Sequence, residues 1–314
     1  MDIALRTPAG SDFRRCFPLL SSPFLCDRSE HDSLCAFWSE IVSSQSGVAA
    51  VAAEADDPDA IVHFAFGVFV SDERVEEYRR CTSPCIARSL LAQWIAGEQP
   101  FLSLQEIARS NAGRGLNLVM THYGHRRGDP RVYVANYESS RRVLRGWNLR
   151  TYTVELFTEP ERDDRAWGRD LGFRVLEYPP SKCRAAGIPM ERAPFLWAAS
   201  REEVKSDAHY GLSLLFETYA PPRFALTLRE QQVLSLALDG GTDTSLARTA
   251  NISESTVKKT FRTIYTKVAR AGIVDLRADD APEQRGAETR RHLLNYVREH
   301  PQELRPYSQG NRRF

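Results

Sequence analysis

The residues between positions 255 and 266 place short hydroxyl side chains and cations at helical spacing. They are Ser255, Lys258, Lys259, Arg262 and Thr266. Lysine and arginine bind phosphate oxygens, and short polar side chains can reach base edges in the major groove of DNA. The spacing therefore predicts a helix that presents a basic, hydroxyl-rich side to duplex DNA. The alternative is the solvated side of an ordinary helix, because runs of charge are usually surface.

An apolar stripe on the same stretch supports the DNA-facing interpretation. It consists of Val257, Phe261, Ile264 and Val268, whose spacing predicts the buried side of one helix. Ser253 is suited to cap this helix, and Glu254 in its first turn suits the helix dipole. Asn251 precedes the cap and tolerates the left-handed backbone that a tight turn often needs.

Two further helices are expected ahead of this one. Thr227 and Glu230 form a capping box for the first, which Gly240 and Gly241 end. Thr242 can cap a short second helix over residues 243–250. The order of helix, short helix, turn and basic helix predicts a helix-turn-helix with one more helix in front.

Residues 226–270 closely resemble the LuxR/GerE-type DNA-binding domain. The positions that match its pattern are Leu226, Thr227, Arg229, Glu230, Val233, Leu234, Gly240, Ala247, Ile252, Ser253, Thr256, Val257, Lys258, Ile264 and Lys267. The resemblance implies a transcriptional regulator that binds double-stranded DNA. The side chains expected at the DNA are Ser253, Ser255, Thr256, Lys258, Lys259, Arg262 and Lys267.

Three positions depart from the family pattern. Leu228 replaces the usual proline at the first helical position, and Asn251 replaces the glycine of the turn. Thr244 stands where the family often has a basic residue, so this chain lacks one cation near the start of the second helix.

Length and charge predict two domains. A chain of 314 residues suits roughly two domains, each able to bury a core. Residues 1–222 carry 26 Lys and Arg against 30 Asp and Glu, a net charge of −4. Residues 223–314 carry 16 against 11, a net charge of +5, and Ala220-Pro221-Pro222 is the expected linker. A basic module appended to a mildly acidic body fits a DNA-binding tail.

The N-terminal domain, residues 1–222, is expected to be an α/β sensor-like domain, and residues 223–314 an all-α domain. Strands are expected at residues 47–54, 61–70, 116–123, 149–157, 173–178 and 195–199. Helices are expected at residues 31–42, 84–97, 104–110, 137–147, 162–171 and 201–216. A further helix over residues 287–299 either packs back on the helix-turn-helix or pairs with a second subunit.

No catalytic motif stands out in the first domain, and we expect neither an enzyme nor a metal or cofactor. The α/β order resembles a GNAT-like or a PAS/GAF-like unit, so the alternative function is an acyltransferase with a DNA-targeting tail. The arginine/glutamine-glycine loop that holds acetyl-coenzyme A in acyltransferases is matched only by the fragment Arg114-Gly115, in a loop that leads from helix to strand. The six cysteines contain no Cys-x-x-Cys pair and are expected to be reduced structural thiols.

The expected partners are DNA, a small-molecule effector and a second copy of the chain. Trp38, Phe64, Phe66, Trp94 and Tyr123 either line an effector pocket or fill the core. A homodimer is expected because two-fold proteins read paired half-sites. No apolar run approaches the ~18 residues of a membrane helix, and the N-terminus lacks the pattern of a signal peptide, so we expect a cytoplasmic protein.

Overall fold

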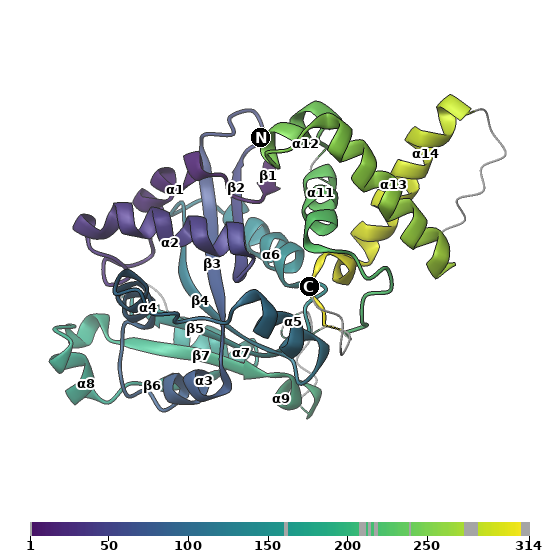
Figure 1. Ribbon diagram of the computed structural model, residues 1–314. Helices are drawn as coiled ribbons and strands as arrows, with labels where there is room; N and C mark the ends of the chain where they lie inside the picture. The colour runs from purple at the N-terminus through teal and green to yellow at the C-terminus, as the bar shows by residue number, and fades with distance from the viewer. Residues whose placement is uncertain are drawn as a thin grey trace. The chain divides into compact units, whose positions relative to one another are not determined.

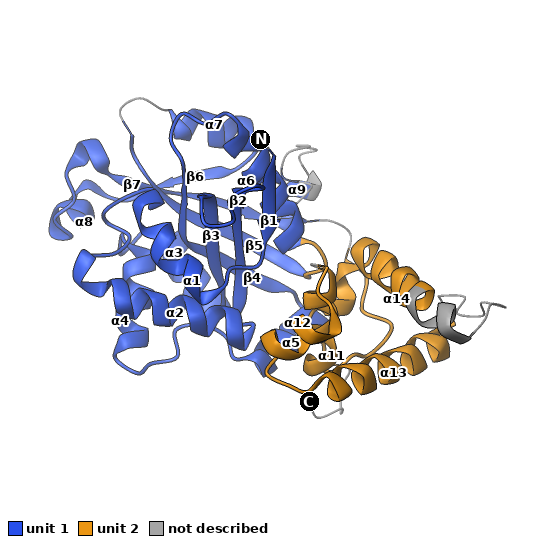
Figure 2. Cartoon of the chain, turned by 90° about the horizontal axis from the view of Figure 1, so that it is seen from above, with its two compact units in different colours: residues 1–144, 148–217 blue, residues 145–147, 218–314 orange. Residues whose placement is uncertain are grey.

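Two compact units make up the chain (Figure 2). The computed structural model describes residues 2–159, 163–206, 212, 215–216, 219–238, 240–272 and 282–308. The N-terminal unit comprises residues 1–144 and 148–217, and the C-terminal unit comprises residues 145–147 and 218–314. The domain boundary expected between residues 222 and 223 remains a prediction.

The N-terminal unit is built around a seven-stranded sheet in the order β1-β2-β3-β4-β5-β7-β6. Its strands are β1 (Ile3–Arg6), β2 (Gly47–Glu54), β3 (Ile61–Val70), β4 (Leu116–His125), β5 (Leu149–Phe157), β6 (Arg174–Glu177) and β7 (Pro194–Ser200). All neighbouring strands are antiparallel except β4 and β5, which are parallel. The β4–β5 pairing ends at Met120 and Val154, although both strands continue, so the sheet opens there. Figure 1 shows β7 running across the direction of β2 and β3.

Helices cover both faces of this sheet. The longer ones are α1 (Gly10–Cys16), α2 (His31–Ser44), α3 (Asp72–Arg79), α4 (Ile86–Ile95), α5 (Leu104–Ala112), α6 (Arg131–Leu144) and α7 (Asp164–Asp170), followed by α8 (Pro180–Ala185) and α9 (Arg201–Ser206). The main core joins α1, α2 and α4 to one face, where Val51, Phe64 and Phe66 point. Ala52 and Val62 point to the other face and pack against Ala135 of α6. Alternation along β2 places Val51 and Ala52 on opposite faces. In β3 the pairing with β2 is irregular between Ile61 and His63, and this bulge turns Val62 to the face opposite Phe64.

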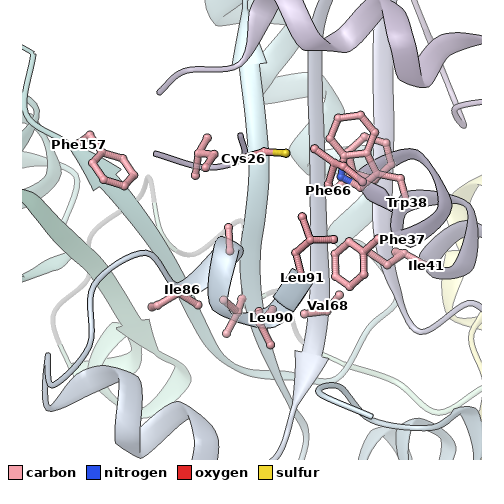
Figure 3. Close-up of a cluster of buried hydrophobic side chains, with 14 of the residues drawn as sticks. Cys26, Phe37, Trp38, Ile41, Phe66, Val68, Ile86, Leu90, Leu91 and Phe157 are labelled. Carbon is pink, nitrogen blue, oxygen red and sulfur yellow. The ribbon is translucent and has the colours of Figure 1, made fainter. Parts of the chain in front are cut away.

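Aromatic side chains fill the main core. Trp38, Phe64 and Phe66 are all 0% exposed, and the rings of Trp38 and Phe66 stack with centroids 4.5 Å apart (Figure 3). Trp94 meets Phe37 edge to face at 5.6 Å. These contacts support the second of the two alternatives for the aromatic residues, a filled core rather than the lining of an effector pocket.

The C-terminal unit is all-helical in the residues described. Its helices are α11 (Leu228–Leu238), α12 (Asp243–Thr249), α13 (Glu254–Ala271) and α14 (Pro282–Glu299), with a short 3-10 helix, η4, at Pro301–Leu304. Val233, Leu234, Val257 and Ile264 are completely buried in one shared core. The expected fold class, an α/β domain followed by an all-α domain, is confirmed.

Several elements differ from the expectations. The strand β1 and the helices α3 and α8 were not predicted, and α6 begins at Arg131 rather than at residue 137. The helix expected over residues 201–216 is described only as far as Ser206. The helix expected from residue 287 begins at Pro282. The sequence leaves room for only a short fourth helix over Gly272–Leu276, and residues 273–276 lie outside the described residues.

Candidate nucleic-acid interface

The start of α11 is held by reciprocal caps. The Thr227 N–H donates to Glu230 Oε2 at 2.6 Å, and the Glu230 N–H donates to Thr227 Oγ1 at 3.4 Å. Each of these N–H groups lies at the helix start, where the helix itself supplies no acceptor. Lys267 of α13 completes the arrangement, because its ammonium donates to Glu230 Oε2 at 2.6 Å and to the Ala225 carbonyl at 3.0 Å.

Lys267 therefore differs from the other residues expected at the DNA. Its side chain is 25% exposed, and Glu230, its partner, is 7% exposed. Both contacts of the Lys267 ammonium group connect α13 to the start of α11. The DNA contact expected of Lys267 stays a prediction, and in this structure the side chain stabilises the fold.

The turn between α12 and α13 has the expected backbone. Thr242 caps α12 by accepting from the Ser245 N–H at 3.3 Å. Asn251 has a φ of 51°, in the left-handed region that asparagine tolerates better than most residues. Thr244 Oγ1 donates to Glu254 Oε1 at 2.7 Å and so joins the first turns of the two helices. The Thr244 position thus carries a helix-to-helix hydrogen bond where related domains often carry a cation.

Ser253 caps α13, as expected. Its hydroxyl oxygen accepts from the Thr256 N–H at 3.1 Å and lies 2.8 Å from the hydroxyl oxygens of Ser255 and Thr256. All three residues are exposed at the first turn of the helix. Hydroxyl groups and free N–H groups at a helix start are suited to bind phosphate oxygens.

The outer side of α13 is basic. Val257, Phe261, Ile264 and Val268 bury the inner side in the core. With 3.6 residues per turn, Ser255, Lys259, Arg262 and Thr266 lie opposite that stripe, and Lys258 lies on its flank. The side chains of Lys258, Lys259 and Arg262 are exposed. Within the described part of the chain, no hydrogen bond or ion pair engages their charged groups.

The C-terminal helix packs back on the helix-turn-helix. Leu293 and Val297 of α14 are 0% exposed in the core that also holds Val257. Arg290 Nη1 lies 2.6 Å from Asp243 Oδ1, and its guanidinium lies 4.2 Å from the centre of the Phe261 ring. Of the two roles left open for this helix, packing against its own module is therefore the observed one.

The chain segment after α14 also closes the unit. Glu303 is 0% exposed, and its carboxylate accepts from the backbone N–H groups of Arg223, at 2.9 Å, and Phe224, at 3.0 Å. Burial raises the pKa of this carboxyl group above its usual range. The last turn thus binds the chain where it enters the helix-turn-helix, so the unit extends well beyond the three helices of the motif.

The sequence comparison agrees with this geometry. The sequence model of the family described as "Bacterial regulatory proteins, luxR family" (GerE) matches residues 225–277. Residues 225–277 are a GerE helix-turn-helix domain. The GerE match lies within the C-terminal unit. No curated protein matches the chain in sequence.

Solved structures resemble the N-terminal part. An N-acetyltransferase from Staphylococcus aureus Mu50 is 8% identical, with a TM-score of 0.36, and covers 64% of this chain and 99% of its own. A Drosophila melanogaster polyamine N-acetyltransferase is 14% identical, with a TM-score of 0.38, and covers 63% of this chain and 100% of its own. BCP1 from Saccharomyces cerevisiae is 11% identical, with a TM-score of 0.37, and covers 70% of this chain and 93% of its own.

These matches correct one expectation. Several of the similar structures are N-acetyltransferases, which contradicts our expectation that the chain is not an enzyme. At such low identity the likeness concerns the fold alone and assigns no substrate and no reacting group to this chain.

Two loops of the N-terminal unit combine arginine with glycine. Arg114 and Gly115 precede β4, whereas helix N-termini that bind anions follow a strand. The strand-to-helix loop lies between β4 and α6 and contains Arg126, Arg127 and Gly128. Gly128 among arginines, directly after the long apolar strand β4, marks this loop in the sequence.

The cations of this loop have partners within the N-terminal unit. Arg126 and Arg131 lie 2.8 Å and 2.9 Å from the carboxylate of Glu54, and Arg131 lies 2.6 Å from Asp129. The hydrogen bonds from Arg131 lower the pKa of Asp129 to about 2, so this carboxylate stays charged. An external anion would have to exchange with the chain's own carboxylates at this helix start.

Proposed function

We propose that this protein is a DNA-binding transcriptional regulator whose helix α13 enters the major groove. One observation supports the proposal above all: the outer side of α13 presents exposed cations, while its inner side is fully buried. A family of bacterial regulators shares this domain. Lys258 contacts the DNA backbone, and Ser255, Lys259 and Arg262 reach base edges.

In this proposal the N-terminal unit senses a small-molecule effector by binding it. A cavity of about 460 Å³ lies beside α3 and α5, a size within the range of small-molecule sites. Asp72 and Glu73 stand on its α3 wall, and Arg109 and Arg114 stand on the wall formed by α5 and the following loop. Walls of both charge signs suit a small polar effector better than an apolar one.

The regulator is proposed to act as a homodimer in the cytoplasm. One recognition helix reads few base pairs, and two-fold proteins bind two half-sites about one helical turn apart. We infer the cytoplasm because the proposed partner is duplex DNA. Within the described residues, no helix has both the length and the apolar character needed to span a bilayer.

The test compares the full chain with a variant that lacks the outer cations. Lys258→Ala, Lys259→Ala and Arg262→Ala are combined, and binding to genomic DNA fragments is measured by fluorescence anisotropy at several salt concentrations. We expect the variant to lose most of the affinity and most of the salt dependence, because phosphate contacts release counterions. A folded variant that binds as tightly as the wild type would refute the proposed role of α13.

A second candidate function is acyl transfer by the N-terminal unit. It is favoured by the strand-to-helix loop with Gly128 and by the opening between β4 and β5 beyond Met120. Calorimetry with acetyl-coenzyme A tests it. Binding that is lost in Arg126→Ala but retained in Arg114→Ala would support the candidate, and heats equal to dilution for the wild-type chain would reject it.

A further inference from the structure

The helix α6 carries an exposed apolar surface. Tyr133 is 59% exposed, Val134 65% and Tyr137 47%, all within two turns of one helix. The other large apolar side chains that stand exposed in the described residues are single and lie on separate elements, namely Ile95, Trp167 and Met190. Isolated exposed apolar residues are normal, whereas a group of them usually marks an interaction surface.

The helix has two distinct sides. Val132, Ala135 and Ser139 face inward, where Ala135 packs on Ala52 and Val62, and Ser139 lies 3.2 Å from His63. This inner side already provides the packing that holds α6 on the sheet. Tyr133, Val134 and Tyr137, which we call the outer surface of α6, contribute nothing comparable to folding in the described part of the chain.

The outer surface of α6 is complementary to a second copy of itself. Tyr133, Tyr137 and Arg141 follow one another at four-residue spacing and therefore lie in one row. Arg141 is exposed, and no hydrogen bond or ion pair holds it within the described residues. When two such helices pack antiparallel with Tyr137 at the centre, each Arg141 meets the ring of the partner's Tyr133. A guanidinium on a tyrosine ring is a favourable cation–π contact.

We propose that the protein dimerises through the outer surface of α6, with α6 packing antiparallel on α6 of a second copy. Tyr137 lies on the two-fold axis, and Tyr133 and Arg141 pair across it. The requirement for a two-fold partner rests on the proposed DNA-binding function. Tyrosine and arginine are also the residues that dominate the binding energy of protein interfaces.

The first test measures self-association without DNA by sedimentation velocity over a wide concentration range. Tyr137→Glu places two like charges on the axis and should weaken the dimer at least ~30-fold. The matched control is Ile95→Glu, which introduces the same charge at a similarly exposed apolar residue of α4 and should leave the dimer unchanged. Circular dichroism must show that both variants fold. Equal self-association of Tyr137→Glu and wild type, or a monomeric wild type, would overturn the inference.

The second test fixes the geometry. Tyr137→Cys should form a disulfide-linked dimer under mild oxidation, because a residue on a two-fold axis meets its own copy. Tyr133→Cys should not, because antiparallel packing places the two copies of residue 133 roughly 12 Å apart along the helix axis. The wild-type chain, oxidised in the same way, shows how much cross-linking the native cysteines cause. Efficient linkage through Tyr133→Cys and none through Tyr137→Cys would refute the antiparallel arrangement.

Failure of this inference and failure of the proposed function give different results. If only the interface is wrong, Tyr137→Glu binds DNA with the wild-type affinity and stoichiometry. If the proposed function is wrong, the wild-type chain itself does not bind DNA. When both hold, Tyr137→Glu keeps the salt dependence of a single subunit and loses the affinity that two linked subunits gain from simultaneous binding.

Discussion

The loop between β4 and α6 and the outer side of α13 use their cations in opposite ways. In the N-terminal unit, Arg126 and Arg131 bind Glu54, and Arg150 lies 2.5 Å from Asp72. On the outer side of α13, Lys258 and Lys259 bind no group of the described chain and extend into solvent. A cation paired with a carboxylate of its own fold helps to hold that fold, whereas an unpaired cation can release counterions when it meets a phosphate. Net charge alone does not distinguish the two uses.

Glu155, a buried carboxyl group of the N-terminal unit, should give the largest effect on stability. Glu155 is 3% exposed and accepts from the N–H groups of Cys85, at 2.9 Å, and Ile86, at 2.8 Å. It thereby caps α4, because Cys85 makes no side-chain cap. Burial raises the pKa of Glu155 from 4.5 to about 7, so its proton is bound more tightly in the folded state than in the unfolded state.

The resulting prediction concerns pH. A raised pKa in the folded state means that the contribution of Glu155 to stability is fully present below pH ~4.5 and is lost as the pH rises through about 7. The loss amounts to roughly 3 kcal/mol. Glu155→Gln mimics the protonated acid and should remove this dependence. Urea denaturation of both proteins between pH 5 and pH 8 measures it, and parallel stability profiles for the two proteins would show that the acid does not titrate in this range.

Local patterns in the sequence predicted much of this fold. The alternating residues of β5 predict Leu149–Phe157 with the observed bounds, and the caps at Thr227, Thr242 and Ser253 mark the starts of three helices. Each of these signals lies within a few residues of chain. β1 carries no such signal, because its four residues become a strand only through pairing with β2.

The candidate site shows the same limit. The basic side of α13 follows from helical spacing, but the difference between Lys258 and Lys267 does not. Both are lysines of one helix, and only tertiary contact with Glu230 commits the second one to the fold. The start of α6 was missed for a related reason: Tyr133 and Val134 face outward and so disturb the amphipathic pattern.

Lys267 of α13 is bound within the fold, as Arg126 and Arg131 of the N-terminal unit are. Replacing it should therefore change the stability of the protein rather than its affinity for DNA. Lys267→Met leaves Glu230, which is 7% exposed, without its cation and should destabilise the C-terminal unit by about 1–3 kcal/mol. Thermal unfolding followed by circular dichroism measures this. Lys259→Met is the matched control and should be neutral in stability. If Lys267→Met instead kept wild-type stability and lost DNA affinity, Lys267 would belong to the DNA-facing set after all.

Lys258 binds no group of the described chain, so replacing it should change the affinity for DNA and leave the stability unchanged. Lys258→Ala should weaken binding to all sequences and flatten the plot of log affinity against log salt by ~0.9 per subunit, the value for one phosphate contact. Stability should not change, since the inner side of α13 is untouched. Changes at Ser255, Lys259 or Arg262 should alter which sequence is preferred. A wild-type salt slope for a folded Lys258→Ala protein would remove this lysine from the interface.

The smallest effect should come from adding a cation rather than removing one. Thr244 stands at the first turn of α12, and its hydroxyl is bound to Glu254 at 2.7 Å. Thr244→Arg gives up that hydrogen bond, which is exposed and so costs at most about 1 kcal/mol, and can place a guanidinium at the DNA backbone. We expect the salt slope to steepen by up to ~0.9 per subunit. Asn295→Arg, on the exposed side of α14, adds the same charge away from α13 and should leave the slope unchanged. Equal steepening by both variants would mean that overall charge, rather than the position of α12, sets the affinity for DNA.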